Sequence, residues 1–303
     1  MAEIHIVETS LVKPVTPTKR HASASNALDL YWSEFGYART VHFYRIQPGH
    51  HDFKAIVQSL KNSLSLLLVH FYPVAGRLVP HTAINSDDNI YSDHDSSLIV
   101  LDCNDSGVEF IEACCLDVDF GQLQQQGFRV QDFFARLTRT ESRLRPEDPV
   151  MSVQVTSFLG GGIAIGCSCD HTIFDGFSFA CMIKSWVELC NGELERYGTG
   201  EIAYVWDNQA ELQQPVVVTE IVDLRTIGFY DAHFGWGQLQ AIRPATLHGS
   251  GVFSLAPPPP RPVYVGDGNV DTSCKLELII RLTSKQMGGF LPSLLSAPWP
   301  NGK

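Results

Sequence analysis

The hydrophobic pattern changes its period once between residues 149 and 190, and the change falls next to a histidine. The runs PVMSVQVTSF and GIAIGCSC are rich in β-forming residues and flank LGGG, which predicts a hairpin with Gly160 to Gly162 at its turn. Past Gly176 the apolar residues recur at helical spacing, and Asn191-Gly192 supplies a stop signal. The segment CSCDHTIFDGFSF (167–179) is therefore predicted at a strand-to-helix junction, where ligands often bind at the rim of a sheet.

The other periodic segments place this junction in a mixed fold. Residues 52–71 follow the i, i+3, i+4 pattern of an amphipathic helix, with Asp52 as N-cap and Pro73 as a stop. Residues 193–215 show no clear period, which is typical of a linker. Strands and helices mix along the chain, so the predicted fold class is α/β or α+β. Strands are predicted at 38–46, 97–103, 108–120, 216–225, 250–257 and 274–282, and a short helix at 284–295.

Composition excludes some classes of partner. The 303 residues are 44% hydrophobic and carry a net charge of −11 without a Lys/Arg block, which disfavours nucleic acid and acidic membrane surfaces. The longest apolar run, 64–76, is too short to span a bilayer, and the first twenty residues have no apolar signal region. Eight cysteines without C-x-x-C spacing indicate free thiols in a reducing compartment, so we expect a cytoplasmic protein.

The residues alone leave three interpretations of His171 and Asp175, which lie four positions apart. They could share a divalent metal ion, although further ligands would have to come from one short strand. His171 could instead be a structural histidine at a strand end, with Asp175 capping the helix that follows. In the third interpretation His171 is a general base. No G-x-S-x-G motif is present, so a base without an enzyme nucleophile would suit direct transfer to a bound acceptor.

Two motifs, taken together and in order, resemble a known family. HTIFDG followed by a helix, and HFGWG further on, are similar to the H-x-x-x-D-G and D-F-G-W-G signatures of the plant acyl-CoA-dependent acyltransferases of the BAHD family. LSLLLVHFYPVAGRL and the segment from VQVTSF to ELCNG fall in the family's order and spacing. The resemblance covers residues 1 to about 195 and then about 216 to 290.

The resemblance implies a fold like that of chloramphenicol acetyltransferase, with two domains of mixed β-sheet and flanking helices around a solvent channel. It implies an acyl-CoA co-substrate, no permanently bound cofactor and no metal. The acceptor would be a small-molecule alcohol or amine of plant secondary metabolism, and the protein would be a monomer. By motif position, His171 would deprotonate the acceptor, Asp175 would fix the loop rather than complete a triad, and Gly176 would permit the turn.

The second motif carries its own expectations. By resemblance, Trp236 would lie near the tetrahedral intermediate and help to hold the oxyanion through its indole N–H. The alternative is that Trp236 only packs in the core. Gly235 and Gly237 would shape the loop around it.

Two departures from the family pattern bear on the domains. His233 stands where the second signature usually has an aspartate that makes a salt bridge. A long segment that normally precedes this signature, with an arginine for the H-x-x-x-D aspartate, is replaced by 196–215. We therefore expect an internal deletion, with an N-terminal domain at 1–195, a linker at 196–215 and an incomplete C-terminal domain at 216–303. The predicted function is acyl transfer, and the alternative is a non-catalytic remnant or a regulatory or binding paralog.

Overall fold

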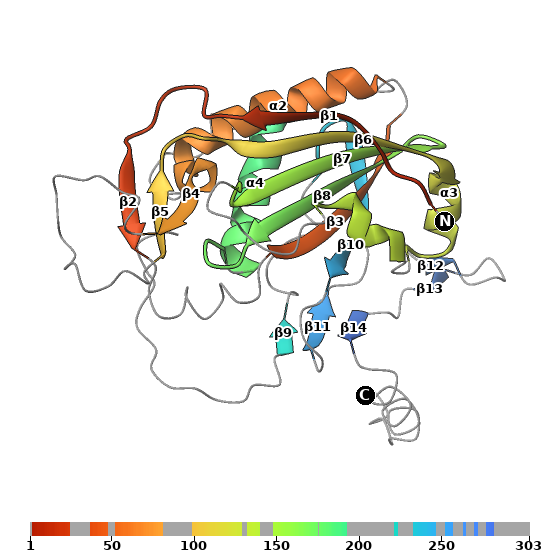
Figure 1. The fold of residues 1–303 in the computed structure, drawn as a ribbon. Coiled ribbons are helices and arrows are strands. Elements are labelled where there is room, and N and C mark those ends of the chain that lie inside the picture. The colour runs from red at the N-terminus through yellow and green to blue at the C-terminus, as the bar shows by residue number, and fades with distance from the viewer. Residues whose placement is uncertain are drawn as a thin grey trace.

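The computed structural model shows a large mixed sheet with helices against it (Figure 1). It describes residues 2–24, 37–47, 52–80, 99–128, 132–139, 148–174, 176–192, 221–223, 233–246, 252–256, 263–264, 270–271 and 277–281.

The main sheet has six strands in the order β1-β6-β7-β8-β3-β10. Neighbouring strands run antiparallel, except that β6 and β7 are parallel. The predicted mixture of strand directions is therefore confirmed. The strands are β1 (His5–Val12), β6 (Val108–Asp119), β7 (Met151–Leu159), β8 (Gly162–Asp170), β3 (Tyr37–Ile46) and β10 (Gly237–Thr246).

The strand β10 comes from the part of the sequence that was expected to form a second domain. It pairs antiparallel with β3, with Gly237 opposite Ile46, and so becomes an edge of the main sheet. Arg243 on β10 donates to the carbonyl oxygens of Phe128 (2.8 Å) and Gly127 (3.0 Å). Hydrogen bonding therefore crosses the expected boundary at 216, while the division of the chain into domains stays a prediction.

The central strands are buried on both faces. In β8 every residue is buried, and β7 is buried from Met151 to Thr156, as expected for strands covered on two sides. One face packs against α2 (Phe53–His70) and α4 (Gly176–Cys190), and the other holds a separate cluster of phenylalanines with Val41 and Leu137. On this second face Gly166 lies so close to Leu137 that a side chain would clash with its carbonyl oxygen.

The helix α2 confirms the prediction from periodicity. Asp52 is its N-cap, and its side chain accepts a hydrogen bond from the backbone N–H of Lys54. The helix ends at His70, before a 3₁₀ turn (Tyr72–Ala75) that contains Pro73. Its buried residues are Ile56, Val57, Leu60, Ser63, Leu64, Leu67 and Leu68.

The hairpin between β7 and β8 also forms where the sequence predicts it. Gly160 and Gly161 make the turn, both at φ +78°, a left-handed conformation that favours glycine. Gly162 is already the first residue of β8. The helix α4 ends at the predicted Asn191-Gly192 stop, where Gly192 has φ +72°.

Smaller elements complete the described part of the chain. One three-stranded sheet has the order β2-β5-β4, another has the order β14-β11-β9, and β12 pairs with β13. The expected linker 196–215 and the expected helix at 284–295 lie outside the described residues. The elements are β2 (His21–Ala24), β4 (Arg77–Pro80), β5 (Ile99–Cys103), α3 (Phe120–Gln125), a 3₁₀ helix (Asp132–Leu137), β9 (Ile221–Asp223), β11 (Val252–Ala256), β12 (Val263–Tyr264), β13 (Val270–Asp271) and β14 (Glu277–Arg281).

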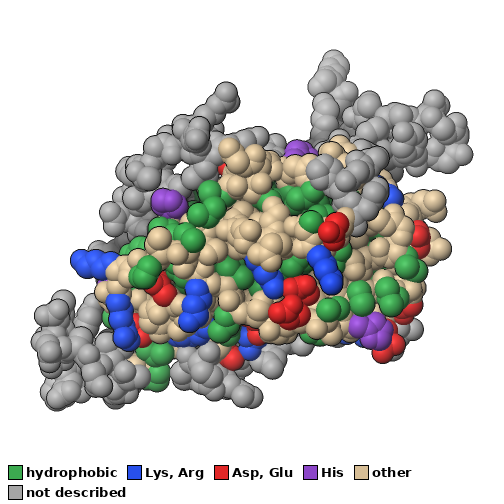
Figure 2. All heavy atoms as spheres, turned by 90° about the horizontal axis from the view of Figure 1, so that it is seen from above, with side chains coloured by type: hydrophobic (Ala, Val, Ile, Leu, Met, Phe, Trp, Pro, Cys, Tyr) green, Lys and Arg blue, Asp and Glu red, His purple; other side chains and the backbone are tan. Residues whose placement is uncertain are grey.

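Acidic and basic side chains are interspersed on the surface that Figure 2 shows, with no basic patch among its described residues. This agrees with the net charge of −11. No helix in the described part of the chain is long and apolar enough to cross a membrane. The seven described cysteines are free thiols, and burial raises the pKa of Cys103 and Cys167 to about 12.

Candidate functional site

His171 lies on a tight turn directly after the central strand β8. The backbone carbonyl of Asp170 accepts hydrogen bonds from the N–H groups of Ile173 (3.1 Å) and Phe174 (3.3 Å). The Asp170 side chain accepts from the N–H (2.8 Å) and the hydroxyl of Thr172. His171 is thus held between two anchored residues, which limits the conformations open to its backbone.

His171 is the only residue from 170 to 174 that is not buried. Asp170, Thr172, Ile173 and Phe174 are each at most 9% exposed. The turn therefore presents the imidazole at the end of the sheet while its neighbours are packed. A partly exposed imidazole on a rigid turn suits a group that must meet a ligand and exchange a proton with it.

The remaining residues of the first motif lead into α4. Asp175 lies outside the described residues, so its expected role in fixing the loop stays a prediction. Gly176 is the first residue of α4, which runs for 15 residues. The helix therefore begins five positions after His171.

The second motif lies at the opposite end of the sheet. Gly237, next to Trp236, pairs with Ile46 at one end of β3, whereas Asp170, next to His171, pairs with Tyr37 at the other. The strand has ten residues, which at roughly 3.3 Å each separates its ends by about 30 Å. Register along β3 therefore places Trp236 and His171 at opposite ends of the strand, and a role for Trp236 at the tetrahedral intermediate stays a prediction.

Trp236 instead belongs to an aromatic cluster under the end of α4. Its ring stacks on Phe234 at 5.3 Å and 13°, and lies 5.5 Å from the ring of Tyr44. Phe234 in turn makes an edge contact with Trp186 of α4 at 5.6 Å. Trp236 is 6% exposed, and its indole N–H has no acceptor among the described residues. This geometry agrees with the alternative of core packing.

Asn191 connects α4 to the second motif. Its side-chain amide donates to the carbonyl oxygen of His233 (2.9 Å) and accepts from the N–H of Gly235 (2.6 Å). A Cβ at position 235 would lie 3.1 Å from the Asn191 oxygen, so glycine permits this approach. The Gly237 N–H closes the turn on the Phe234 carbonyl at 2.9 Å. Sequence reasoning recognised Asn191 only as a helix stop, because this contact joins residues far apart in the chain.

His233 contributes its backbone to that contact. The family pattern has at this position an aspartate that makes a salt bridge. The side chain of His233 is exposed, while its carbonyl oxygen holds Asn191. The contact described here is therefore independent of the side chain at position 233.

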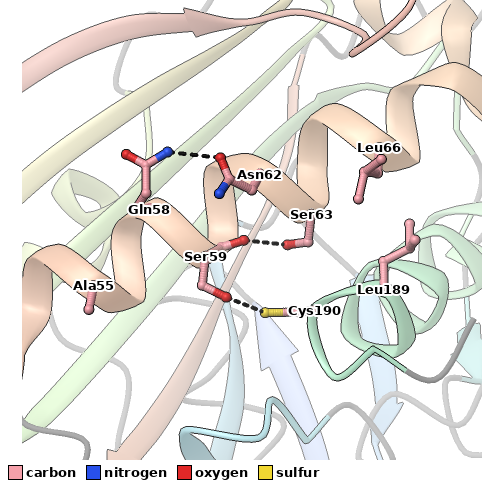
Figure 3. Close-up of a pocket in the computed structure, with 8 residues that line it drawn as sticks. All are labelled: Ala55, Gln58, Ser59, Asn62, Ser63, Leu66, Leu189 and Cys190. Carbon is pink, nitrogen blue, oxygen red and sulfur yellow. Dashed lines mark hydrogen bonds between the residues drawn. The ribbon is translucent and has the colours of Figure 1, made fainter.

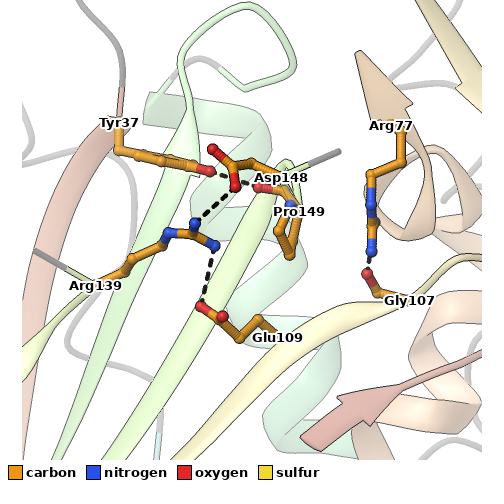
Figure 4. Close-up of polar contacts among 7 residues, drawn as sticks. All are labelled: Tyr37, Arg77, Gly107, Glu109, Arg139, Asp148 and Pro149. Atoms are coloured by element: carbon orange, nitrogen blue, oxygen red, sulfur yellow. Dashed lines mark hydrogen bonds and ion pairs between the residues drawn. The ribbon is translucent and has the colours of Figure 1, made fainter. Parts of the chain in front are cut away.

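A largely buried ionic cluster lies beside Tyr37 (Figure 4). Tyr37 pairs with Asp170, next to His171, across the main sheet. Arg139 pairs with Glu109 (3.2 Å) and Asp148 (2.9 Å), and the hydroxyl of Tyr37 donates to the carbonyl of Pro149 (2.6 Å). Burial raises the pKa of Tyr37 above its usual value, so the hydroxyl stays protonated. The cluster braces β3 and the entry to β7 beside the strand that carries His171. No local sequence motif predicted this ionic cluster.

A surface hollow of about 460 Å³ lies between α2 and α4 (Figure 3). Within it the Ser59 hydroxyl is 3.3 Å from the Cys190 sulfur. Leu189 and Cys190 are at the far end of α4 from the first motif, so this hollow is separate from the His171 turn. Among the described residues, no group of three or more His, Cys, Asp or Glu side chains could hold a metal ion.

The fold is that of the chloramphenicol acetyltransferase-like acyltransferases, as predicted. The crystal structure of vinorine synthase matches with a TM-score of 0.64 and 17% identity, covering 94% of this chain and 96% of that chain. TRI101 of F. sporotrichioides, complexed with coenzyme A and T-2, matches with a TM-score of 0.50 and 16% identity over 66% of this chain and 46% of its own. At these identities the likeness concerns the fold.

The Transferase family model matches residues 2–203, more than half of the chain. The chain belongs to this family, the BAHD acyltransferases. It is 31% identical to hydroxycinnamoyltransferase 2 of Oryza sativa subsp. japonica over 63% of this chain and 40% of the relative. It is 35% identical to vinorine synthase of Rauvolfia serpentina over 46% of this chain and 30% of that protein. The chain spans about two fifths or less of the length of these curated relatives.

Proposed function

We propose that this chain transfers an acyl group from an acyl-CoA thioester to the hydroxyl or amine of a small-molecule acceptor, with His171 as general base. The observation that carries the proposal is the placement of His171, partly exposed on a braced turn at the end of the sheet. Membership of the BAHD family supports acyl transfer, and the relatives include hydroxycinnamoyl and malonyl transferases.

In the proposed reaction the neutral imidazole of His171 accepts the proton of the acceptor O–H or N–H. The freed oxygen or nitrogen attacks the thioester carbonyl and forms a tetrahedral intermediate. Collapse of the intermediate breaks the carbon–sulfur bond, and the leaving thiolate takes the proton from the imidazolium. The protein forms no covalent intermediate, so one base suffices for both proton transfers.

The other expectations complete this proposal. Asp175 fixes the motif loop, and Gly176 gives the chain its entry into α4. Coenzyme A thioester is a co-substrate, and no metal or permanently bound cofactor takes part. The protein acts as a cytoplasmic monomer in plant secondary metabolism, without nucleic acid or membrane partners, and the internal deletion lies between the two motifs.

The test is transfer by the full chain, followed by chromatographic detection of the ester or amide. We expect His171→Ala to lower turnover about 10²–10⁴-fold, because general-base catalysis contributes about that much. His5→Ala is the matched control, since His5 is exposed on the edge strand β1. Retention of most activity by a folded His171→Ala protein would refute the assignment of the base.

The chain matches only part of the length of its relatives, which supports a second candidate function. A chain that spans about two fifths of hydroxycinnamoyltransferase 2 could be a non-catalytic remnant or a regulatory paralog that still binds its ligand. Thermal unfolding with coenzyme A, together with the transfer assay, separates the two. A catalytic chain is stabilised by the ligand and turns over, whereas a binding paralog is stabilised without turnover and a remnant shows neither.

A further inference from the structure

Asp170 is a buried acid next to the proposed base, and the mechanism above does not use it. Its side chain is fully buried at the end of β8. Its backbone N–H donates to the Val150 carbonyl at 2.8 Å, and its own carbonyl and Oδ1 accept the bonds that form the turn. Asp170 thus ties the turn of His171 both to the neighbouring strand and to Thr172.

The second carboxylate oxygen of Asp170, Oδ2, takes no part in the hydrogen bonds of the turn. Among the described residues nothing donates a hydrogen bond to Oδ2. An amide would satisfy the bond from the Thr172 N–H equally well, so the turn by itself does not require a charge here. An anion kept in a buried position at a cost in solvation suggests an electrostatic use for it.

Among the described residues, the groups that face Asp170 across the main sheet come from β3 and β8. Tyr37 on β3 faces it across the sheet, and Ser168 precedes it on the same face of β8. Beyond Tyr37 lies the ionic cluster, whose charges also shift the pKa of Tyr37. Arg39 lies on the same strand as Tyr37. In that cluster Arg139 is already paired with Glu109 and Asp148. Asp170 directly precedes His171 in the chain, and its Oδ2 accepts no hydrogen bond from the described residues.

We propose that Asp170 is a positioning residue for His171, whose carboxylate holds the turn that carries the imidazole and stabilises that imidazole when it takes up a proton. The inference rests on the proposed role of His171 as base. The aspartate of the H-x-x-x-D signature is a different residue, Asp175.

The protonation state of Asp170 makes its effect on His171 dependent on pH. Burial raises its pKa to about 6, partly offset by the two bonds from Thr172. Near neutral pH the carboxylate is ionised and can act on His171, and in mild acid it is neutral. Loss of activity in acid should therefore follow two protons, one on each residue.

The decisive variant is Asp170→Asn, which keeps an oxygen for Thr172 and removes the charge. The readout is the imidazole pKa of His171 in histidine-labelled full chain, measured by NMR and assigned with His171→Ala. We expect that pKa to fall by about 1 unit, as for loss of a nearby opposite charge. Ser168→Ala is the matched control: it removes a buried polar group from the same strand face, and should leave the His171 pKa unchanged.

Activity provides the second readout. We expect Asp170→Asn to lower kcat about tenfold with little change in KM, and to reduce the slope of the acid limb from two protons to one. An unchanged His171 pKa and an unchanged acid limb in Asp170→Asn would overturn the proposal, even if His171→Ala is inactive. A lowered His171 pKa in a chain without any turnover would support Asp170 and refute the proposed function.

Thr172→Val serves if Asp170→Asn does not fold. It removes the hydroxyl that bonds Oδ1 while leaving the backbone bond in place. We expect the His171 ring resonances to shift and broaden as the turn loosens. Ring resonances identical to those of the unmodified chain would count against positioning by the Asp170–Thr172 contact.

Discussion

Two buried residues, Asp170 and His42, have opposite pKa shifts, so their contributions to stability change in opposite directions over nearly the same range of pH. Burial raises the pKa of Asp170 to about 6 and lowers that of His42 to about 4. The raised pKa of Asp170 means that its contribution to stability is complete below pH 3.8 and is lost as the pH rises through about 6. The lowered pKa of His42 means that its contribution is complete above pH 6.5 and is lost as the pH falls through about 4. Each amounts to about 3 kcal/mol, so the two nearly cancel.

Asp170→Asn should expose the His42 titration. We expect the free energy of unfolding of this variant to fall by about 3 kcal/mol between pH 6.5 and 4, whereas these two groups leave the unmodified chain nearly level. Above pH 6 the variant should be at least as stable as the unmodified chain, because an ionised buried group has been removed. Urea unfolding at a series of pH values measures this. A variant with the same pH profile as the unmodified chain would show that Asp170 does not titrate between folded and unfolded states.

Trp236 supplies a second prediction for single residues. Trp236→Phe keeps an aromatic ring against Phe234 and Tyr44 and removes an N–H that has no described acceptor. We expect a modest loss of stability, on the order of 1 kcal/mol for the smaller ring, and unchanged turnover per folded molecule. Thermal unfolding and kcat measured on the same sample would test this. A large fall in kcat at unchanged stability would instead support the predicted oxyanion role of Trp236.

Elements with one buried face were the most predictable part of the fold. The helix α2 and its Asp52 cap followed from periodicity because its apolar stripe is buried along its length. The strand β1 was not predicted, since all but two of its residues are exposed and its sequence shows no alternation. At the site, a local motif marked the His171 turn. The position of Trp236 depends on pairing between β10 and β3, which no local pattern reveals.

Asn191 tests the connection between α4 and the second motif. Asn191→Ala removes a donor to His233 and an acceptor for Gly235, and should cost about 1–3 kcal/mol. Amide hydrogen exchange should accelerate in the last turn of α4 and at residues 234–237. Asn62→Ala on α2 is the control, because Asn62 makes an exposed contact with Gln58 only one helical turn away. Equal exchange in both variants would show that the Asn191 contact does not hold the helix end.

At the scale of the whole molecule, the main sheet joins residues from both sides of the expected linker. The sixth strand is held by ladder bonds to β3 and by Arg243, which donates to carbonyls of the turn after α3. Removal of β10 would leave those carbonyls and the edge of β3 without these partners. The strand therefore behaves as part of the first sheet, whatever the rest of 216–303 does.

We expect 233–246 to unfold together with the main sheet. Arg243→Met keeps the chain length and removes the bonds to Gly127 and Phe128, so the transition should move to lower denaturant without splitting. Exchange at β10 amides and at β8 amides, followed through the same urea series, should give coincident midpoints. Midpoints that separate in the unmodified chain would show that β10 is an independent attachment.

The helix α4 sets the distance between the first motif and the Asn191 contact with the second motif. It starts within the first motif and ends next to Asn191, whose side chain hydrogen-bonds to His233 and Gly235 of the second motif. One residue inserted into α4 would rotate the far end of the helix by about 100° and advance it by about 1.5 Å. Both motifs would remain intact in the sequence, but the Asn191 side chain would no longer point toward His233 and Gly235.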